Sequence, residues 1–128
     1  PIVNVIPFKI KQLFYNLVDN AVKYRHPNRP LIINIAAETV NSGFVKELDN
    51  KYEQYYRLSI TDNGIGFDVQ YSTKIFEIFQ RLHSRLKVSG TGIGLAICKK
   101  IIQNHHGHIN ATGETDKGAT FNVYLPVL

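Results

Sequence analysis

The sequence has no apolar run long enough to cross a membrane. Its apolar stretches, such as Leu31 to Ile33 and Ile35 to Ala37, are short and are interrupted by Asn34. A membrane helix needs roughly 20 consecutive apolar residues, and the apolar residues 1–6 are too few for a secretory signal. We therefore expect a cytoplasmic domain, which is compatible with a longer parent protein anchored in a membrane elsewhere.

Cysteine is nearly absent as well. Cys98 is the single cysteine, which excludes an intrachain disulfide, and its place in the apolar run Leu95 to Cys98 predicts a small buried side chain. The five histidines match no metal-binding spacing with cysteine or acidic residues. His105 and His106 follow a predicted helix, where they suit a contact with the helix dipole. The sequence thus offers neither a thiol nucleophile nor a histidine-based metal site.

Long blocks of like charge are absent, although the chain is basic. It has 15 Lys and Arg against 10 Asp and Glu, a net charge of +5, and its basic residues concentrate in 23–29 and 81–100. A basic domain indicates phosphate-containing ligands, nucleic acid or an anionic membrane as partners. Nucleic acid is disfavoured, because the basic residues are not interleaved with aromatic residues in a recognisable pattern.

The chain length and the apolar periodicity predict one domain, residues 1–128, with a core drawn from 44% hydrophobic residues. Residues 40–54 are polar and are interpreted as a loop or an irregular hairpin. Helices alternate with antiparallel hairpins, which favours a two-layer α/β sandwich over a doubly wound parallel sheet. The predicted elements are helices at 8–24 and 93–104 and strands at 31–39, 55–61, 109–112 and 119–125.

The first predicted helix has a polar face. Gln12, Asn16, Asn20 and Lys23 lie on one side of it and span about 80° of its circumference. Carboxamides and a lysine in this arrangement can hold a hydrated magnesium ion and its phosphates, because Mg²⁺ prefers oxygen ligands and keeps several waters. A plain solvated face is the other interpretation of the same pattern.

Two glycine-rich segments suggest a nucleotide site. Asp62 to Gly66 follows a strand, where a carboxylate can accept a hydrogen bond from a base amine and glycines let a flat base approach the backbone. The same residues are common in ordinary turns. Ser89 to Leu95 opens the last helix, whose free amides favour an anion. It does not fit the dinucleotide pattern, because Leu95 stands where a glycine is needed, and the phosphate-binding loop pattern is absent.

Together these segments resemble the ATPase domain shared by histidine kinases, type II topoisomerases, the mismatch-repair protein MutL and a heat-shock chaperone family. The resemblance covers nearly the whole chain and is specific to the histidine-kinase branch, because a phenylalanine-rich motif absent from the other branches is present. The matching motifs are QLFYNLVDNAVKY at 12–24, DNGIGF at 62–67, FEIFQR at 76–81, GTGIGLAICKKII at 90–102 and GATF at 118–121.

The resemblance implies the Bergerat ATP-binding fold, a mixed, mostly antiparallel sheet packed on about three helices. It implies ATP and Mg²⁺ as cofactors, with Asn20 as the metal ligand. Asn16 and Lys23 resemble contacts to phosphate or to metal-bound water, and Tyr24 resembles the aromatic residue on the adenine or ribose. Arg81 resembles a basic residue that approaches the γ-phosphate, so Asn16 and Arg81 are the expected catalytic residues.

The remaining expected site residues surround the base and form the ATP lid. Asp62 resembles the acceptor of the adenine amine, Gly64 and Gly66 shape that pocket, and Thr120 resembles a hydroxyl that assists Asp62 through a water. Residues 67–89 are predicted to order when ATP binds. The hinge and phosphate-binding end of the lid are expected at Gly90, Thr91, Gly92, Gly94 and Leu95.

The function that this resemblance implies is transfer of the γ-phosphate of Mg-ATP to a histidine on a separate phosphoacceptor domain, in two-component signal transduction. The chain is expected to be a fragment that is monomeric alone and does not phosphorylate itself. Its partners would be its own phosphoacceptor domain and, through a homodimeric full-length kinase, a response regulator. Gln12 stands near the position where hydrolytic branches use glutamate, which disfavours rapid hydrolysis. An anti-sigma serine kinase and a nucleotide-binding module without transfer activity are the alternatives.

Overall fold

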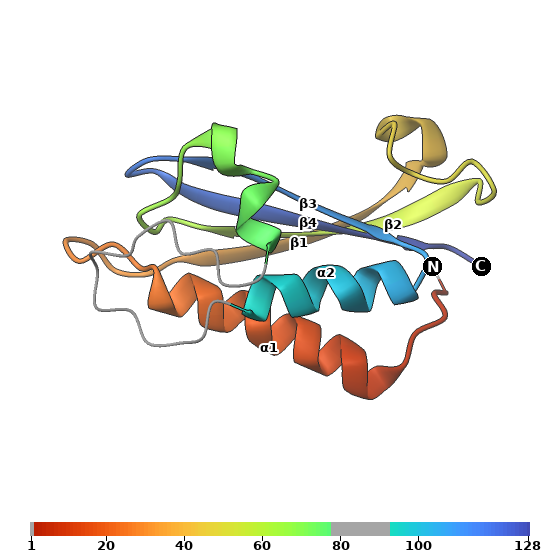
Figure 1. Cartoon of the computed structure of the whole chain (residues 1–128), viewed down its shortest axis with the longest axis horizontal. Helices are drawn as coiled ribbons and strands as arrows, with labels where there is room; N and C mark the ends of the chain where they lie inside the picture. Colours follow the sequence, from red (N-terminus) through yellow and green to blue (C-terminus); the bar gives the residue numbers. More distant parts are fainter. Residues whose placement is uncertain (1, 78–92) are drawn as a thin grey trace.

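The chain folds into two layers, with both helices on one face of a four-stranded sheet (Figure 1). The computed structural model describes residues 2–77 and 93–128. Each predicted helix and strand is present, with bounds that differ by a few residues. The elements are α1 (Pro7–Lys23), β1 (Ile33–Asn41), β2 (Gln54–Asp62), α2 (Gly94–Asn104), β3 (His108–Glu114) and β4 (Gly118–Pro126), with short 3-10 helices at Ser42–Phe44, Val69–Tyr71 and Lys74–Phe76.

The strand order is β1-β2-β4-β3, and every neighbouring pair is antiparallel. The predicted two-layer sandwich is therefore confirmed. Within residues 2–77 and 93–128 the sheet has no parallel pair, and two α-helices cover it rather than about three. In the same part of the chain, no helix is long and apolar enough to span a membrane.

The core lies between the helices and the sheet. Pro7 begins α1, where a missing backbone N–H costs nothing, and Leu13, Leu17 and Ala21 form the buried stripe of this helix. They meet side chains of α2 and of the inner sheet face. Cys98 of α2 is fully buried, and burial raises the pKa of its thiol to about 12. The predicted structural role of this cysteine fits its surroundings.

The segment between β1 and β2 covers part of the opposite sheet face, at the end of the sheet near both chain termini (Figure 1). It begins with the 3-10 helix Ser42–Phe44 and buries Leu48. Leu48 packs with Val40, Tyr55 and Tyr124 in a second, smaller apolar cluster. The segment interpreted from sequence as a loop or hairpin is thus a cover for this end of the outer face.

His105 joins the start of α1 to the end of α2. It is 7% exposed, its Nδ1 lies 2.7 Å from the carbonyl oxygen of Ile101, and its Nε2 accepts a hydrogen bond of 3.0 Å from the backbone amide of Ile6. With Nε2 as an acceptor, Nδ1 is the ring nitrogen that donates to the Ile101 carbonyl. His105 thus contacts the end of α2 through a hydrogen bond to a helix carbonyl.

Candidate nucleotide-binding site

The polar face of α1 is half-buried. Gln12, Asn16, Asn20 and Lys23 are all partly covered, whereas Leu17 on the apolar face is 1% exposed. The Lys23 ammonium lies 2.9 Å from the carboxylate of Asp19, one helical turn earlier. Asp19 escaped the sequence analysis, although its i,i+4 spacing to Lys23 was the signal that could have found it. The pair holds the lysine at the end of the polar face.

Asn16 has an unsatisfied amide. Its Nδ2 is buried and has no hydrogen-bond partner among the described residues. The thiol of Cys98 lies beside it, but thiol sulfur is a weak acceptor and does not satisfy an amide donor. A buried donor without a partner costs roughly 1–3 kcal/mol. This amide donor is therefore buried between α1 and α2 without a strong acceptor among the described residues.

Asp62 ends β2 as a buried carboxyl group, 9% exposed. Burial raises the pKa of this carboxyl group, and the backbone amides of Gly64 and Ala119 oppose that rise. The Gly64 amide donates to Oδ1 over 2.8 Å. Two amides do not fill the acceptor capacity of a carboxylate, which has about four lone-pair sites. Asp62 can accept a further hydrogen bond from an amine.

The loop after Asp62 packs against the end of α1 so closely that side chains are excluded. The Ile65 amide donates to the Tyr24 carbonyl over 2.9 Å. A Cβ at Gly64 would lie 2.4 Å from that same carbonyl oxygen, and Gly66 has a φ of +64°, which favours glycine. Gly64 therefore lets Asp62 and the C-terminal end of α1, with Tyr24, come together in one site, whereas Gly66 packs against the turn between β3 and β4, where a Cβ would lie 2.1 Å from the Glu114 carbonyl oxygen.

Arg29 stabilises this loop from outside. Its guanidinium donates to the backbone oxygens of Asn63, Gly64 and Asp116, over 2.8, 3.0 and 2.6 Å. Arg29, one of the basic residues in segment 23–29, therefore has a structural role in holding this loop and is not needed to account for phosphate binding. Its three backbone acceptors come from distant turns, so no local sequence signal could have revealed the role.

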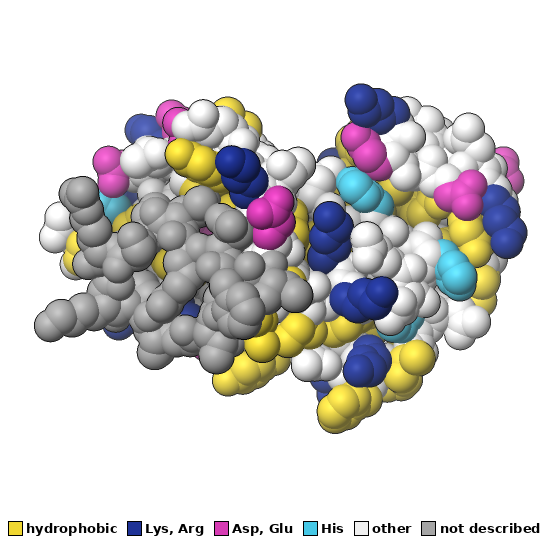
Figure 2. Space-filling model, in the orientation of Figure 1, with side chains coloured by type: hydrophobic (Ala, Val, Ile, Leu, Met, Phe, Trp, Pro, Cys, Tyr) yellow, Lys and Arg dark blue, Asp and Glu magenta, His cyan; other side chains and the backbone are white. Residues whose placement is uncertain are grey.

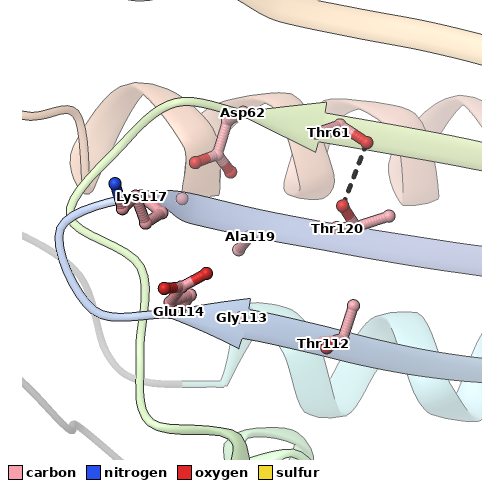
Figure 3. A pocket seen from close by; sticks show the side chains of 9 residues that line it. Thr61, Asp62, Thr112, Gly113, Glu114, Lys117, Ala119 and Thr120 are labelled. Atoms are coloured by element: carbon pink, nitrogen blue, oxygen red, sulfur yellow. Dashed lines mark hydrogen bonds between the residues drawn. The ribbon is translucent and has the colours of Figure 1, made fainter.

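The strand register argues against the expected role of Thr120, although Asp62 and Thr120 line the same cavity. The register places Asp62 opposite Ala119 and Thr61 opposite Thr120. Because side chains alternate between the two faces of a sheet, Thr120 projects from the face opposite that of Asp62. The hydroxyls of Thr61 and Thr120 lie 3.0 Å apart (Figure 3), and both line an open cavity of about 280 Å³ with Lys117 and Glu114. Next to Asp62, Ala119 offers only its backbone.

The lid end of the site is partly described. Gly94 and Leu95 form the first residues of α2, and Ile93 before them provides no side-chain cap. The first amides of a helix have no partner within the helix, which suits an anion. Arg81, Gly90, Thr91 and Gly92 lie outside the described residues, as does most of the expected lid. Phe76 is buried and meets Phe121 edge to face, with ring centroids 6.2 Å apart.

Charge and ligand chemistry at the site suit a magnesium-bound triphosphate. One face of the molecule carries several lysine and arginine side chains (Figure 2). Helix α2 contributes the exposed Lys99 and Lys100. The described residues contain no group of three or more His, Cys, Asp or Glu side chains that could hold a metal ion by themselves. Mg²⁺ needs no such group, since phosphate oxygens and water supply most of its ligands. The carboxamide oxygen of half-buried Asn20 fits the single protein ligand that such an ion requires.

A buried carboxyl at a strand end, a glycine loop against α1, a carboxamide face on α1 and an uncapped start of α2 define an ATPase-type nucleotide-binding domain. The family model described as "Histidine kinase-, DNA gyrase B-, and HSP90-like ATPase" matches residues 6–128. The chain belongs to this family. The expected ATP-binding domain of the histidine-kinase type is therefore confirmed.

Curated relatives place the chain in the histidine-kinase branch. It is 45% identical to cyanobacterial phytochrome A of Nostoc sp. over 119 residues, which cover 93% of this chain and 14% of that protein. It is 32% identical to the adaptive-response sensory kinase SasA of Synechococcus sp. (strain JA-3-3Ab), over 99% of this chain and 30% of that protein. The chain spans less than a third of the length of these relatives.

Solved structures share the fold. The catalytic domain of histidine kinase ThkA superimposes with a TM-score of 0.70 at 29% identity, over 97% of this chain and 70% of that chain. The mycobacterial sensor histidine kinase MprB has a TM-score of 0.78 at 24% identity, over 97% of this chain and 76% of that chain. Full-length ShkA, solved in complex with AMPPNP, has a TM-score of 0.70 at 25% identity, over 92% of this chain and 21% of that chain.

Proposed function

We propose that this chain binds Mg-ATP and presents the γ-phosphate to a histidine on a separate phosphoacceptor domain. The observation that carries the proposal is Asp62, a buried carboxyl group with spare acceptor capacity beside a glycine loop. A buried acceptor that must be paired selects a base with an amine, as adenine has, and rejects guanine, whose carbonyl would leave the acceptor unpaired.

The residues of the chain position the nucleotide rather than react with it. Asn20 would contribute an oxygen ligand to the metal, and the metal, when bound, neutralises charge on the phosphates. Asn16 and Lys23 would contact phosphate or metal-bound water. Arg81 is proposed to stabilise charge on the transferred phosphoryl group. Gln12 cannot take a proton from water, so free hydrolysis should be slow.

The proposed partners are the phosphoacceptor domain of the same protein and, through a homodimeric full-length kinase in the cytoplasm, a response regulator. The similarity to the adaptive-response sensory kinase SasA favours this partner over the serine substrate of an anti-sigma kinase. A module that binds nucleotide without transfer would bind ATP equally well. Only a transfer assay separates it from a kinase.

Two titrations test the binding step. We expect ATP with Mg²⁺ to bind the wild-type chain, and GTP to bind more weakly by several kcal/mol, the usual cost of leaving a buried acceptor unpaired. Chelation of Mg²⁺ should weaken ATP binding in the wild type. Equal affinity of the wild type for ATP and GTP would contradict the role of Asp62.

A mixing assay tests the transfer step. Radiolabelled ATP is incubated with the chain alone, with a separate histidine hairpin from its parent kinase, and with a His→Ala hairpin. We expect acid-labile label on the wild-type hairpin only, at a low rate because the tether that supplies a high effective concentration is missing. Label on the isolated chain would mean that one of its own histidines is a phosphoacceptor. Arg81→Ala should slow transfer more than it weakens ATP binding.

A further inference from the structure

Strand β1 leaves a long backbone edge unpaired. It is the first strand in the order β1-β2-β4-β3 and pairs on one side only, with β2. The Ile32 carbonyl accepts from Asn63 and the Ser42 amide donates to Glu53, both partners lying in or beside β2. Backbone groups of a strand alternate in direction, so even-numbered residues face β2 and odd-numbered residues face outward. Ile33, Ile35, Ala37 and Thr39 therefore offer N–H and C=O groups that no described residue uses.

This edge lacks the features that usually block strand pairing. Native edges are protected by lysine, proline, bulges or short length, but residues 33–41 read INIAAETVN and pair with β2 without a bulge over nine residues. Ile35 is 56% exposed and Ala36 and Ala37 are exposed as well. The single charge, Glu38, is already paired with Arg57 of β2. Another strand could therefore add here without meeting an unpaired charge.

We infer that the β1 edge pairs with the β1 edge of a second copy of this chain, antiparallel about a two-fold axis at Ala36. In this register the outward-facing Ile33 and Ile35 of one copy exchange backbone hydrogen bonds with Thr39 and Ala37 of the second copy. The exposed Ile35 gains an apolar neighbour, because Ala37 of the second copy lies across from it.

Charge and symmetry favour a second copy over an unrelated strand. In this register Glu38 lies across from Asn34 of the second copy, so its carboxylate meets an amide donor and not another carboxylate. A register two residues along, with the axis at Ala37, would place Glu38 across from Ala36 instead. A two-fold contact uses the same surface on both copies and closes after two chains. The pairing joins two sheets and does not rest on the proposed kinase function.

Association of the free domain is expected to be weak, since the contact is a single strand pair. The free domain should therefore be monomeric, as expected from the sequence, except at high protein concentration. Linking two copies in one assembly would raise their effective concentration and favour the pairing without any new contact. The edge would then hold two nucleotide-binding domains together as one continuous sheet.

Disulfide trapping tests the register. At the axis, Ala36 lies across from itself in a non-hydrogen-bonded pair, with Cα atoms about 4.5 Å apart, which suits a disulfide. Ala36→Cys should form a linked dimer at least about tenfold faster than Glu38→Cys under the same mild oxidation, because only the former pair meets disulfide geometry. A mixture of Asn34→Cys and Glu38→Cys should give mainly the mixed dimer. Native Cys98 is fully buried and should not contribute.

A backbone variant tests the edge itself by sedimentation. Ala37→Pro removes an outward-facing N–H that has no partner in residues 2–77 and 93–128, and proline is tolerated on an edge strand. The wild type should sediment faster as its concentration rises, and Ala37→Pro should not, with the same circular dichroism spectrum. Should Ala37→Pro fail to fold, Ile35→Lys serves instead, with Val69→Lys as the charge-matched control at an exposed site elsewhere. Equal trapping at positions 36 and 38, or association of the edge variants at wild-type strength, would overturn the inference.

Discussion

Strand β2 carries a buried polar side chain at each end, and the two differ in how they complete their hydrogen bonds. Tyr55 is 1% exposed, and its hydroxyl donates to the Asp49 carbonyl over 2.9 Å. Asp62 is 9% exposed and keeps acceptor capacity beyond the amides that it contacts. Burial raises the pKa of both groups. A buried polar group that the chain satisfies stabilises the fold, whereas one left in need of a donor marks a binding site.

Removing the Tyr55 side chain should produce the largest effect on folding. Tyr55→Ala empties part of the small cluster with Leu48 and Tyr124, and truncating a buried aromatic residue costs about 3–5 kcal/mol. Urea unfolding measures this loss, and ATP titration of the folded protein should show unchanged affinity. Weaker ATP binding by the folded variant would mean that the two ends of β2 are coupled.

The two faces of α1 give a second contrast, in which the expected loss of stability is equal to or smaller than that of Tyr55→Ala. Leu17→Ala opens a cavity in the core and should cost about 2–5 kcal/mol of stability. Asn20→Ala removes a half-buried polar side chain, so it should leave the fold nearly unchanged and remove the dependence of ATP binding on Mg²⁺. Comparable melting of both variants would show that the faces are wrongly assigned.

The sequence predicts this division of α1 well, because helical periodicity separates Leu17 from Asn20 without any knowledge of the tertiary structure. It also places Asp62 at a strand end. The sequence does not show that Thr120 and Asp62 project from opposite sheet faces, because a motif does not specify the face and one step of register exchanges the faces. Arg29 and Leu48 escaped prediction because their partners, Asp116 and Tyr124, lie far away along the chain.

The pH dependence of stability should differ in sign for two buried groups. The pKa of Asp62 is raised by burial, so the folded state binds its proton more readily, and this group favours folding as pH falls through its folded pKa toward the ordinary aspartate value. The pKa of His108 is lowered, chiefly by burial, so this group disfavours folding as pH falls through the ordinary histidine value.

Matched variants separate these contributions. The stability deficit of the wild type relative to Asp62→Asn should shrink on acidification between the raised folded pKa and the ordinary aspartate pKa. The difference between the wild type and His108→Gln should change at higher pH, near the ordinary histidine pKa, and with the opposite sign. Urea unfolding across the pH range measures both, and a pH-independent difference for either pair would refute the assigned cause.

The most direct test of the account measures Asp62→Asn in two ways on one preparation. Asparagine keeps the size of the side chain and removes the buried charge, so we expect the free energy of unfolding at neutral pH to rise by about 0.5–2 kcal/mol, as at other sites where function opposes stability. Calorimetric titration of the same sample with Mg-ATP should show binding weakened by several kcal/mol, because the amine of adenine loses its carboxylate acceptor. A variant that is less stable and binds ATP as the wild type does would contradict the account.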